Sequence, residues 1–479
     1  MQPNQESTLT QGLKKISQTH PGQTALVPLF SGMDALIGRI ALAVSASNSL
    51  DLQYYIWHND NSGKLLMAAI LAAADRGVKV RLLLDEIHGA DVEDPMRTLS
   101  EHVNIEVRLF NPFHNRTWNT LDFVTRFSEA NRRMHNKAFI ADNSAAIVGG
   151  RNIGDEYFEA SKDLDFGDFD IVTYGDIVTD VSKSFDSYWN HKMAVPIEVT
   201  YGKKPKISLE DLRKDLIEHR HKIEATPYAD ALKGSPFLTS LRERRLETFW
   251  GSGVVVADPP QKISQDKIPA EDLLIHQLQQ AMGRAESEIF IISPYFVPGD
   301  QGVAMIAAAV KRGVKVKILT NSLASNDVSV VHAGYKGYRK PLIEAGAELY
   351  ELKPSLNKVK KGKKKGMFAS RSGLHGKVYF FDNRKMFVGS LNLDPRSVYI
   401  NSEMGVVVES PELIHFLLTN VSDRLSENTY RLYLDEDKDL RWESKTKGQK
   451  TIYTKEPETS WWQRFKNTVV TPFVPEDLL

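Results

Sequence analysis

The sequence has 479 residues, enough for two or three domains and a large buried core. Its 61 lysine and arginine residues balance 61 aspartate and glutamate residues, so no net charge draws the whole molecule onto nucleic acid or an anionic membrane. The absence of cysteine excludes disulfides, thiol nucleophiles and cysteine-based metal sites. No apolar run has the length of a membrane span, and the polar N-terminus shows no signal peptide.

Helices and strands are predicted in the same order twice along the chain. A core-facing helix at residues 33–44 has apolar residues at helical spacing, and an apolar strand at 49–57 follows it. An Ala-rich helix then ends at Gly77, the usual position of a helix-stopping glycine, before a Val- and Leu-rich strand. The second set repeats this order, with its strand at 288–296 and its helix ending at Gly313.

The repetition extends to the residues themselves. The segment 75–85, DRGVKVRLLLD, returns 236 residues later as KRGVKVKILTN at 311–321. A second pattern, His-x-Lys, recurs at a spacing of 240 residues, and two unrelated features with nearly the same offset indicate an internal duplication at domain scale. Because strands alternate with helices, we expect two α/β halves with mainly parallel, helix-covered sheets, related by a pseudo-two-fold axis.

A charge-dense link with scattered prolines is expected to separate the two halves, and it contains a predicted helix near residues 209–222. The residues after about 434 are expected to form an appendage. The predicted units are an N-terminal extension at 1–24, a first domain at 25–199, the link at 200–267, a second domain at 268–434 and the C-terminal appendage at 435–479.

The His-x-Lys pattern belongs to a longer motif that occurs in both halves, as MHNKAFIADNSAAIVGGRN at 134–152 and as LHGKVYFFDNRKMFVGSLN at 374–392. The residues after each histidine are apolar and β-prone, and residues two apart on a strand point the same way. His135 and Lys137 would therefore share one face. His375 and Lys377 would do the same. An imidazole beside an ammonium group suits an anionic ligand, because lysine neutralises oxygen atoms while histidine reaches the central atom.

Turns and small residues complete each motif. Asp-Asn pairs predict turns at Asp142-Asn143 and Asp382-Asn383. A short return strand then ends in Gly149, Gly150, Arg151 and Asn152 in the first copy, and in Gly389, Ser390, Leu391 and Asn392 in the second. Small residues there let backbone N–H groups approach a ligand closely. Each half thus offers about half of a phosphate site.

Two such halves face to face would place two imidazoles, two ammonium groups and two amides around one phosphoryl group. One neutral histidine can attack phosphorus while the other, protonated, donates to the leaving oxygen and later acts as a base for an alcohol or water. Lysine and asparagine would stabilise the equatorial oxygens in the transition state, each such donor contributing roughly 10²–10³ in rate. We expect no metal ion and no other cofactor, since the sequence shows no carboxylate cluster that would hold a metal.

These motifs resemble the signature of the phospholipase D superfamily, H-x-K-x4-D-x6-G-S/G-x-N, which is usually present twice. The resemblance covers both halves and implies two phospholipase D-like αβα sandwich domains with the active site at their interface. It also implies a phosphohistidine intermediate, with His135 as the nucleophile and His375 as the general acid and base, although the sequence alone leaves their order open. The implied phosphate-binding residues are Lys137, Lys377, Asn152 and Asn392.

In this superfamily a later carboxylate orients each histidine, and the matching positions are Asp168 in FGDFD and Glu403 in NSEMG. Asp163 and Asp165 are alternatives to Asp168, because a loop is inserted at this point. The resemblance also implies that the motif aspartates, like the small residues after them, are structural. These structural positions are Asp142, Asp382, Gly149, Gly150, Gly389 and Ser390.

A narrower resemblance is to bacterial cardiolipin synthases, through LQYYIWHND, RRMHNKAF, VGGRNIGDEYF and LNLDPRS. The Gly-Gly of the first copy, in place of Gly-Ser, is shared with one branch of them. The implied reaction is phosphatidyl transfer. One phospholipid loses its headgroup alcohol to leave phosphatidyl-histidine, and the terminal hydroxyl of phosphatidylglycerol then attacks to give cardiolipin. Phosphatidylglycerol or phosphatidylethanolamine would be the donor, and with both motifs in one chain no dimer would be required.

Many cardiolipin synthases carry N-terminal membrane spans, and this sequence has none, so we expect peripheral attachment to the bacterial inner (cytoplasmic) membrane. One candidate segment, NKVKKGKKKGMF, has six lysines between positions 358 and 365, among them Lys363, Lys364 and Lys365. Each lysine near an anionic surface adds up to ~1 kcal/mol. A solvated loop, or a segment that contacts nucleic acid backbones, would have the same composition.

The second candidate is the tail SWWQRFKNTVVTPFVPEDLL, in which Trp461, Phe465 and Val469 recur every four residues with Trp462 beside them. Paired tryptophans flanked by cations suit a helix in the membrane interface, and the alternative is a terminal helix docked on the protein's own core. Aromatic residues at the carboxyl ends of predicted strands are candidates for lining a lipid channel, although strand aromatics are also common in cores. They are Tyr54, Tyr55, Trp57, Tyr295 and Phe296.

Three other functions compete with phosphatidyl transfer. A phospholipase D-type hydrolase would give the same intermediate to water. A phosphodiesterase or nuclease would use the same histidines on nucleic acid, but the zero net charge disfavours it, and we expect no nucleic acid partner. A catalytically inactive membrane scaffold would keep the fold alone, which the intact motifs disfavour. Phospholipids and a membrane surface are therefore the expected partners.

Overall fold

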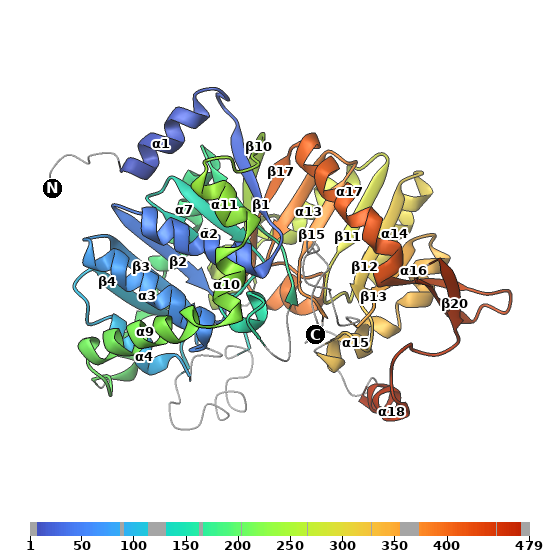
Figure 1. Cartoon of the computed structure of the whole chain (residues 1–479). Coiled ribbons are helices and arrows are strands. Elements are labelled where there is room, and N and C mark those ends of the chain that lie inside the picture. Colours follow the sequence, from blue (N-terminus) through green and yellow to red (C-terminus); the bar gives the residue numbers. More distant parts are fainter. Residues whose placement is uncertain are drawn as a thin grey trace.

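The computed structural model describes residues 7–86, 91–113, 131–161, 166–202, 204–265, 267–326, 328–354, 373–446 and 448–470. Two α/β halves lie side by side, each with a central sheet between layers of helices (Figure 1). The predicted fold class, a duplicated αβα architecture, is confirmed. The two sheets have the same strand order, which is what an internal duplication requires.

The sheet of the first half has the strand order β9-β4-β3-β2-β5-β6-β8-β1. Among the neighbouring strands of this sheet, β2 pairs in parallel with β3 and β3 with β4, and the other pairings are antiparallel. The strands are β1 (Thr24–Leu29), β2 (Ser49–Tyr54), β3 (Lys79–Asp85), β4 (Ile105–Phe110), β5 (Ala138–Ala141), β6 (Ala145–Gly149), β8 (Asp170–Tyr174) and β9 (Ala194–Pro196).

The sheet of the second half has the order β18-β13-β12-β11-β15-β16-β17-β10, so every strand of the first half has a counterpart. The expectation of mainly parallel sheets is wrong. In both halves the motif strand turns back on itself as a hairpin, β5–β6 or β15–β16, and so brings antiparallel strands into the sheet. The strands are β10 (Phe249–Ala257), β11 (Glu288–Ile292), β12 (Lys315–Asn321), β13 (Glu348–Leu352), β15 (Val378–Phe381), β16 (Lys385–Gly389), β17 (Met404–Glu409) and β18 (Thr429–Leu434).

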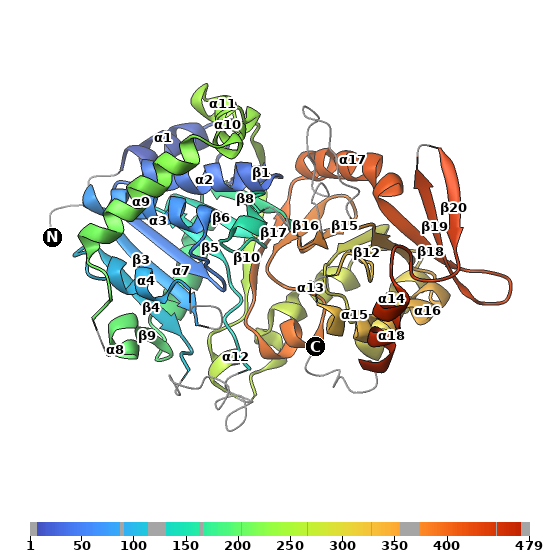
Figure 2. The same ribbon diagram turned by 60° about the horizontal axis from the view of Figure 1, so that its bottom comes forward.

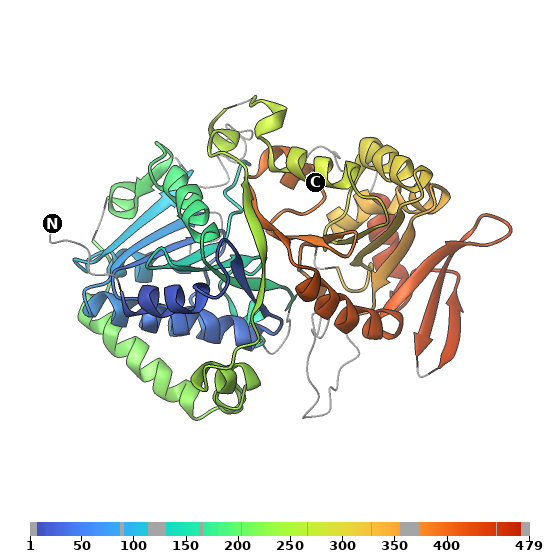
Figure 3. The same ribbon diagram turned by 90° about the horizontal axis from the view of Figure 1, so that it is seen from above.

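β10 lies in the segment that the sequence suggested was a link, and it is a strand of the sheet. Its residues 252–257 pair with β17, and its residues 249–251 pair with β1 of the first half. The edges of the two sheets are thereby joined, and β10 crosses between the halves (Figure 3). The predicted helix in this segment is α9 (Leu209–Glu224), which contacts α3 (Asn61–Asp75) of the first half.

Helices cover the outer faces of both sheets and also fill the space between the halves. α2 (Gly32–Ser45) and α3 lie on the outer face of the first sheet. Shortly after the end of α3, Gly77 has a positive φ of 97°, a left-handed backbone conformation that favours glycine. One buried apolar cluster includes α7 (Ile177–Trp189), α17 (Pro411–Asn428) and strands of both sheets. A core shared in this way holds the two halves in one fixed arrangement.

The remaining elements are short or peripheral. The other helices of the first half are α1 (Thr8–Ser17), α4 (Glu93–Leu99), α8 (Ile197–Tyr201), α10 (Pro227–Lys233) and α11 (Pro236–Arg242). Those of the second half are α12 (Gln261–Ser264), α13 (Leu274–Gly283), α14 (Gly299–Lys311), α15 (Ser329–Lys336), α16 (Arg339–Glu344) and α18 (Trp461–Val470). The short strands β7 (Phe166–Gly167) and β14 (Gly373–Leu374) form a separate two-stranded sheet.

Within the predicted appendage, β19 (Leu440–Thr446) and β20 (Gln449–Tyr453) extend the second sheet outward from β18. α18 follows them and lies beside α15 (Figure 2). Among the residues that the structure describes, no helix is both long and apolar enough to span a bilayer.

Candidate active site

The two His-x-Lys motifs occupy equivalent places in the two sheets. His135 and Lys137 lie in extended chain directly before β5, and His375 and Lys377 lie directly before β15. They were expected on the strands themselves, and they lie at the point where the chain enters the strand. At each histidine the backbone pairs across the interface between the halves.

Two backbone hydrogen bonds make this crossing. The histidine N–H groups donate to the carbonyl oxygens of Ser402 (2.9 Å) and Gly167 (2.7 Å), each in the opposite half. The residue after Ser402 is Glu403, and the residue after Gly167 is Asp168. The local pairing therefore brings a carboxylate of one half beside the histidine of the other.

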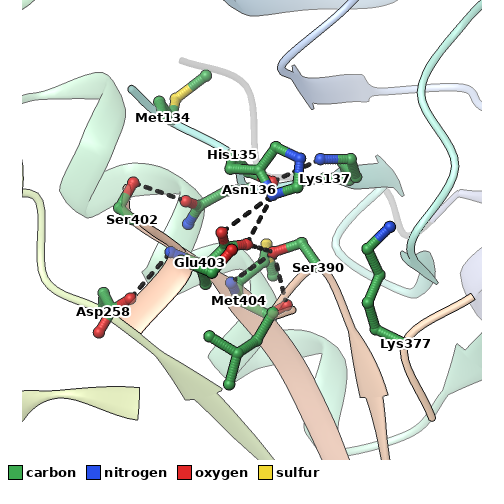
Figure 4. Close-up of polar contacts among 12 residues, drawn as sticks. Met134, His135, Asn136, Lys137, Asp258, Lys377, Ser390, Ser402, Glu403 and Met404 are labelled. Atoms are coloured by element: carbon green, nitrogen blue, oxygen red, sulfur yellow. Dashed lines mark hydrogen bonds and ion pairs between the residues drawn. The ribbon is translucent and has the colours of Figure 1, made fainter. Parts of the chain in front are cut away.

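Glu403 contacts His135 across the interface. Its Oε2 and Oε1 atoms lie 2.8 and 3.0 Å from Nδ1 of the imidazole (Figure 4). The hydroxyl of Ser390 donates to Oε2 at 2.5 Å, so the carboxylate is held from a second side. Burial raises the pKa of Glu403 to about 8, against the opposing charge of Lys137. Because the contact occupies Nδ1, Nε2 is the ring nitrogen left to reach a phosphorus atom.

Asp168 makes the reciprocal contact with His375. Its Oδ2 lies 2.5 Å from Nδ1 of the imidazole. Burial alone would raise the pKa of Asp168, but the charge of His375 and the hydrogen bond to it hold that pKa well below its usual range. An ionised carboxylate at this distance favours a proton on the imidazole. The competing candidates Asp163 and Asp165 lie outside the described residues.

Both motif lysines are buried, and their charges act on His135. Lys137 donates to the carbonyl of His135 at 2.7 Å, and Lys377 lies 3.0 and 3.1 Å from the two ring nitrogens of His375. Burial lowers the pKa of Lys137 to about 7 against the opposing charge of Glu403, and the charge of Lys377 contributes to that lowering, so the two ammonium groups interact (Figure 4). Burial, followed by the charges of Lys137, Lys377 and His375, holds the pKa of His135 well below its usual value. The groups of both halves therefore act within one electrostatic site, in which His135 is neutral.

The motif asparagines differ in their contacts. The amide nitrogen of Asn152 donates to the hydroxyl of Tyr157 at 3.0 Å, and its oxygen accepts from the N–H of Ile56 at 3.3 Å. Asn392 is buried, and its Oδ1 has no hydrogen-bond partner among the described residues. A flip of this amide would present its NH₂ donors instead, and a phosphoryl oxygen requires such donors.

After the first glycine, one motif has Gly150 and the other has Ser390, and each of these residues lies beside the carboxylate of a different histidine. A Cβ at Gly150 would lie 2.4 Å from Oδ1 of Asp168, so the space beside this carboxylate admits only glycine. In the second motif Ser390 stands at this place and donates to Glu403. The Gly-Gly of the first motif thus follows from the position of the carboxylate beside His375.

The motif aspartates hold the start of the first parallel strand in each half. Oxygens of Asp142 accept from the N–H groups of Ser47, Asn48 and Ser49, and those of Asp382 accept from Glu286, Ser287 and Glu288. Each aspartate and the asparagine after it have positive φ, between 49° and 55°, as a tight hairpin turn requires. These hydrogen bonds join the aspartates to the backbone at the strand start, which is a structural role.

The predicted channel aromatics fall into two groups. Tyr54, Trp57 and Phe296 are part of the hydrophobic core, with at most 2% of each side chain exposed. Tyr55 and Tyr295 are only partly buried. The ring of Tyr55 meets that of His135 edge to face, with 4.8 Å between the ring centres.

Several residues of the site were missed by the sequence reasoning. The ring of Tyr157 meets that of His375 in the same edge-to-face manner, at 5.3 Å. Arg151 is buried and donates to the backbone carbonyl of Asp168 at 2.5 Å, so it supports the loop that orients His375. A charged residue inside a small-residue motif was the available signal for it.

Asp258, which follows β10, supports Glu403, the carboxylate beside His135. Its Oδ2 accepts from the N–H of Glu403 at 3.0 Å and from the ammonium group of Lys262 at 2.8 Å. The four-residue spacing of Asp258 and Lys262 was visible in the sequence, but it lay in the segment taken for a link. The link thus contributes to the site as well as to the sheet.

The candidate membrane residues are only partly described. Trp461, Trp462 and Phe465 of α18 are 59%, 61% and 46% exposed. Lys363, Lys364 and Lys365 lie outside the described residues. Among the residues that the structure describes, no group of three or more His, Asp or Glu side chains is placed to hold a metal ion.

Comparison with known proteins identifies the repeated unit. The family model described as "Cardiolipin synthase, PLD-like domain" matches residues 40–189 and again residues 278–423. The two matches fall on the two halves, each of which contains one His-x-Lys motif. They agree with the duplication inferred from the repeated segments.

Individual relatives extend the match to nearly the whole chain. Cardiolipin synthase C of Escherichia coli K12 is 41% identical over 95% of this chain and 96% of its own length. Cardiolipin synthase 1 of Bacillus anthracis is 24% identical over 88% of this chain and 70% of its own length.

A solved structure shares the fold. The crystal structure of phosphatidylserine synthase from Haemophilus influenzae Rd KW20 aligns with 98% of this chain and 100% of its own, at a TM-score of 0.58 and 13% identity. At that identity the likeness concerns the fold alone. The duplicated family match, together with a relative 41% identical over almost its full length, shows that this chain belongs to the cardiolipin synthase family of phospholipase D-like enzymes.

Proposed function

We propose that this chain is a phosphatidyltransferase that forms cardiolipin from phosphatidylglycerol and a second phospholipid through a phosphohistidine intermediate. The observation that carries the proposal is the pair of crossed contacts, His135 with Glu403 and His375 with Asp168. They give one interface two imidazoles whose Nδ1 atoms are both occupied by carboxylates. Family membership supports the same activity.

In the first step, Nε2 of His135 attacks the phosphorus atom of the donor lipid. The N–P bond forms, the bond from phosphorus to the headgroup oxygen breaks, and the proton on His375 passes to that oxygen. The headgroup alcohol leaves as glycerol from phosphatidylglycerol, or as ethanolamine from phosphatidylethanolamine. The phosphatidyl group remains on His135.

In the second step, the now neutral His375 takes the proton from the terminal hydroxyl of phosphatidylglycerol. The alkoxide oxygen attacks phosphorus, the N–P bond breaks, and His135 is released neutral with cardiolipin as the product. His375 again carries the proton, so the enzyme returns to its starting state.

The assignment of the nucleophile is supported by the electrostatics of the two dyads. Burial and the neighbouring cations keep the pKa of His135 low, so its imidazole is neutral, as a nucleophile must be. The low pKa of Asp168 keeps a negative charge beside His375, which favours the protonated imidazole that a general acid needs.

Four further side chains are proposed to bind the transferred phosphoryl group. They are Lys137, Lys377, Asn152 and Asn392. Ammonium and amide donors fixed before the reaction stabilise the charge that develops on the equatorial oxygens, each contributing roughly 10²–10³ in rate. We assign Tyr55 and Tyr295, which are partly buried, to contact with the lipid.

The substrate class implies attachment to a membrane surface. We propose that the chain acts as a peripheral protein of the bacterial inner membrane, and that a single chain suffices because both motifs lie in it. The exposed aromatic residues of α18 support a contact with lipid.

Incubation with labelled phosphatidylglycerol, with and without phosphatidylethanolamine, tests this function. Cardiolipin as the main product is expected, and it should be absent with the His135→Ala variant. Phosphatidic acid as the only product would mean that water is the acceptor, and the assigned reaction would then be hydrolysis instead of transfer. The absence of any lipid product, with cleavage of DNA, would reject a lipid substrate.

A further inference from the structure

A pocket lined by several charged residues lies away from the two histidines. It has a volume of about 410 Å³ and is lined by residues of α15, α16, β19 and α18, none of which belongs to the candidate active site. Its charge is uneven. The charged residues that line it are Lys336, Arg339, Lys340, Lys455, Arg464 and Glu456. Five cations and one carboxylate suit an anionic ligand of small size.

Arg339 lines this pocket and is held in place by two carboxylates. The side chain is 1% exposed, and its terminal nitrogens lie 2.5 Å from Glu456 and 2.7 Å from Glu351. Its Nε is buried and has no hydrogen-bond partner among the described residues. The two carboxylates thus fix the guanidinium in the wall of the pocket.

The helix that closes the pocket has an aromatic face. Arg464 of α18 lines the pocket, whereas Trp461, Trp462 and Phe465 are 59%, 61% and 46% exposed on the same helix. Their rings contact one another, with 4.7 to 5.9 Å between ring centres. A cluster of this size costs free energy in water, and tryptophan beside cations is typical of the bilayer interface.

The pocket and the candidate active site lie at the same edge of the second sheet. The side chain of Asn321, the last residue of β12, bonds both the N–H (2.9 Å) and the carbonyl (3.0 Å) of Leu374, which directly precedes His375. Two residues after Asn321, Leu323 lines the pocket. A lipid bound at the pocket would therefore hold this edge toward the lipid surface.

We infer that this pocket binds the phosphate headgroup of an anionic phospholipid within a bilayer, while the aromatic face of α18 lies in the interface of the same bilayer. The inference rests on the proposed function only in taking a membrane as the source of substrate. It assigns a second lipid site, at which no chemistry occurs, that positions the catalytic edge on the membrane.

Sedimentation with vesicles tests the pocket in the full chain. All variants carry His135→Ala, so that the lipid composition stays constant during the measurement. The Lys340→Gln/Lys455→Gln variant should partition roughly 10- to 30-fold more weakly onto phosphatidylcholine vesicles that contain phosphatidylglycerol. Lys214→Gln/Lys222→Gln on α9 removes the same charge from side chains 63% and 74% exposed, and it should bind like the parent.

The aromatic face is tested separately. Trp461→Ser/Trp462→Ser should weaken binding to vesicles with and without phosphatidylglycerol, whereas Val103→Ser, at a side chain 87% exposed in the first half, should change neither. Equal binding by the two lysine variants would overturn the inference. So would binding of free glycerol 3-phosphate at this pocket as tight as that of the vesicles, because a soluble phosphate would then be the ligand.

The outcome is separable from that of the proposed function. Lysine-dependent binding of vesicles by a chain that forms no cardiolipin would reject the function and support this inference. If the parent chain forms cardiolipin but the two lysine variants bind vesicles equally well, the proposed function is supported and this inference is rejected.

Discussion

Oε2 of Glu403 lies 2.8 Å from Nδ1 of His135, although 268 residues separate them in the chain. The reciprocal pair, Asp168 and His375, crosses the same interface in the opposite direction at 2.5 Å. Neither half therefore contains a complete dyad. A separated half would keep its histidine and lose the carboxylate that orients it.

Replacing the carboxyl group of Glu403 by an amide is expected to reduce turnover rather than binding. Glu403→Gln keeps the size of the side chain but cannot hold the proton on Nδ1 of His135, so Nε2 loses its lone pair for part of the time. We expect kcat for cardiolipin formation to fall roughly 10²-fold or more, with little change in KM. Glu409→Gln, at the end of the strand that directly follows Glu403 and paired with Arg384, is the matched control and should retain full activity. Equal kcat values for the two variants would remove Glu403 from the mechanism.

His375→Ala is expected to accumulate the covalent intermediate. His135 can still attack a donor lipid whose leaving alcohol is acidic enough to depart unprotonated, but no base remains to activate the acceptor. A phosphatidyl adduct on the peptide that contains His135 should be detected by mass spectrometry and should be labile to acid. His135→Ala serves as the control and should form no adduct. An adduct on His375 in that control would reverse the assigned roles.

The affinity of the site for a doubly charged anion is expected to fall as the pH rises through about 7. Burial lowers the pKa of Lys137 to about 7, so its ammonium form, which binds anions, predominates below that pH and is lost above it. Sulfate keeps its charge over this range and reports on the protein alone. Calorimetry should show a loss of up to ~10-fold in affinity per pH unit for one linked proton. The difference between the parent and Lys137→Met isolates this site, and an equal pH dependence in the two would contradict the prediction.

Asp142→Ala is expected to destabilise the fold while sparing the chemistry. The carboxylate accepts from three consecutive backbone N–H groups at the start of β2, and its loss leaves them without their acceptor. The free energy of unfolding should decrease by ~1–3 kcal/mol in urea denaturation. Turnover measured well below the unfolding temperature should be unchanged. Asp382→Ala should behave in the same way, and a loss of kcat without a loss of stability would assign these aspartates a catalytic role.

Much of the fold could be predicted from the sequence, because it depends on local patterns that occur twice along the chain. The offset of 236 residues between the repeated segments revealed the duplication, and the glycines after α3 and α14 marked where those helices end. The mainly parallel sheet was predicted wrongly, because alternating strands and helices do not reveal which neighbour a hairpin strand chooses. β10 was missed as a strand of the sheet for a related reason. Its partners, β1 and β17, are far from it in sequence, and a charge-dense context concealed it.

The candidate site shows the same division. The His-x-Lys motifs and the two carboxylates could be named from their spacing and from the resemblance, but the spacing did not show that each carboxylate serves the other half. Arg151 and Tyr157 were missed because their roles depend on contacts with Asp168 and His375 that exist only after the halves meet. Of the predicted aromatic residues, Tyr55 contacts His135, whereas Tyr54, Trp57 and Phe296 belong to the core.

By itself, the sequence determined the duplication, the residue types of the two motifs and the chemistry that they allow, because these depend on short-range patterns. Only the tertiary structure decided that the halves exchange carboxylates, that β10 joins their sheets, and that a basic pocket lies beside the aromatic face of α18. Those features arise from contacts between residues that are distant in the chain, and such contacts leave no periodic signal along it.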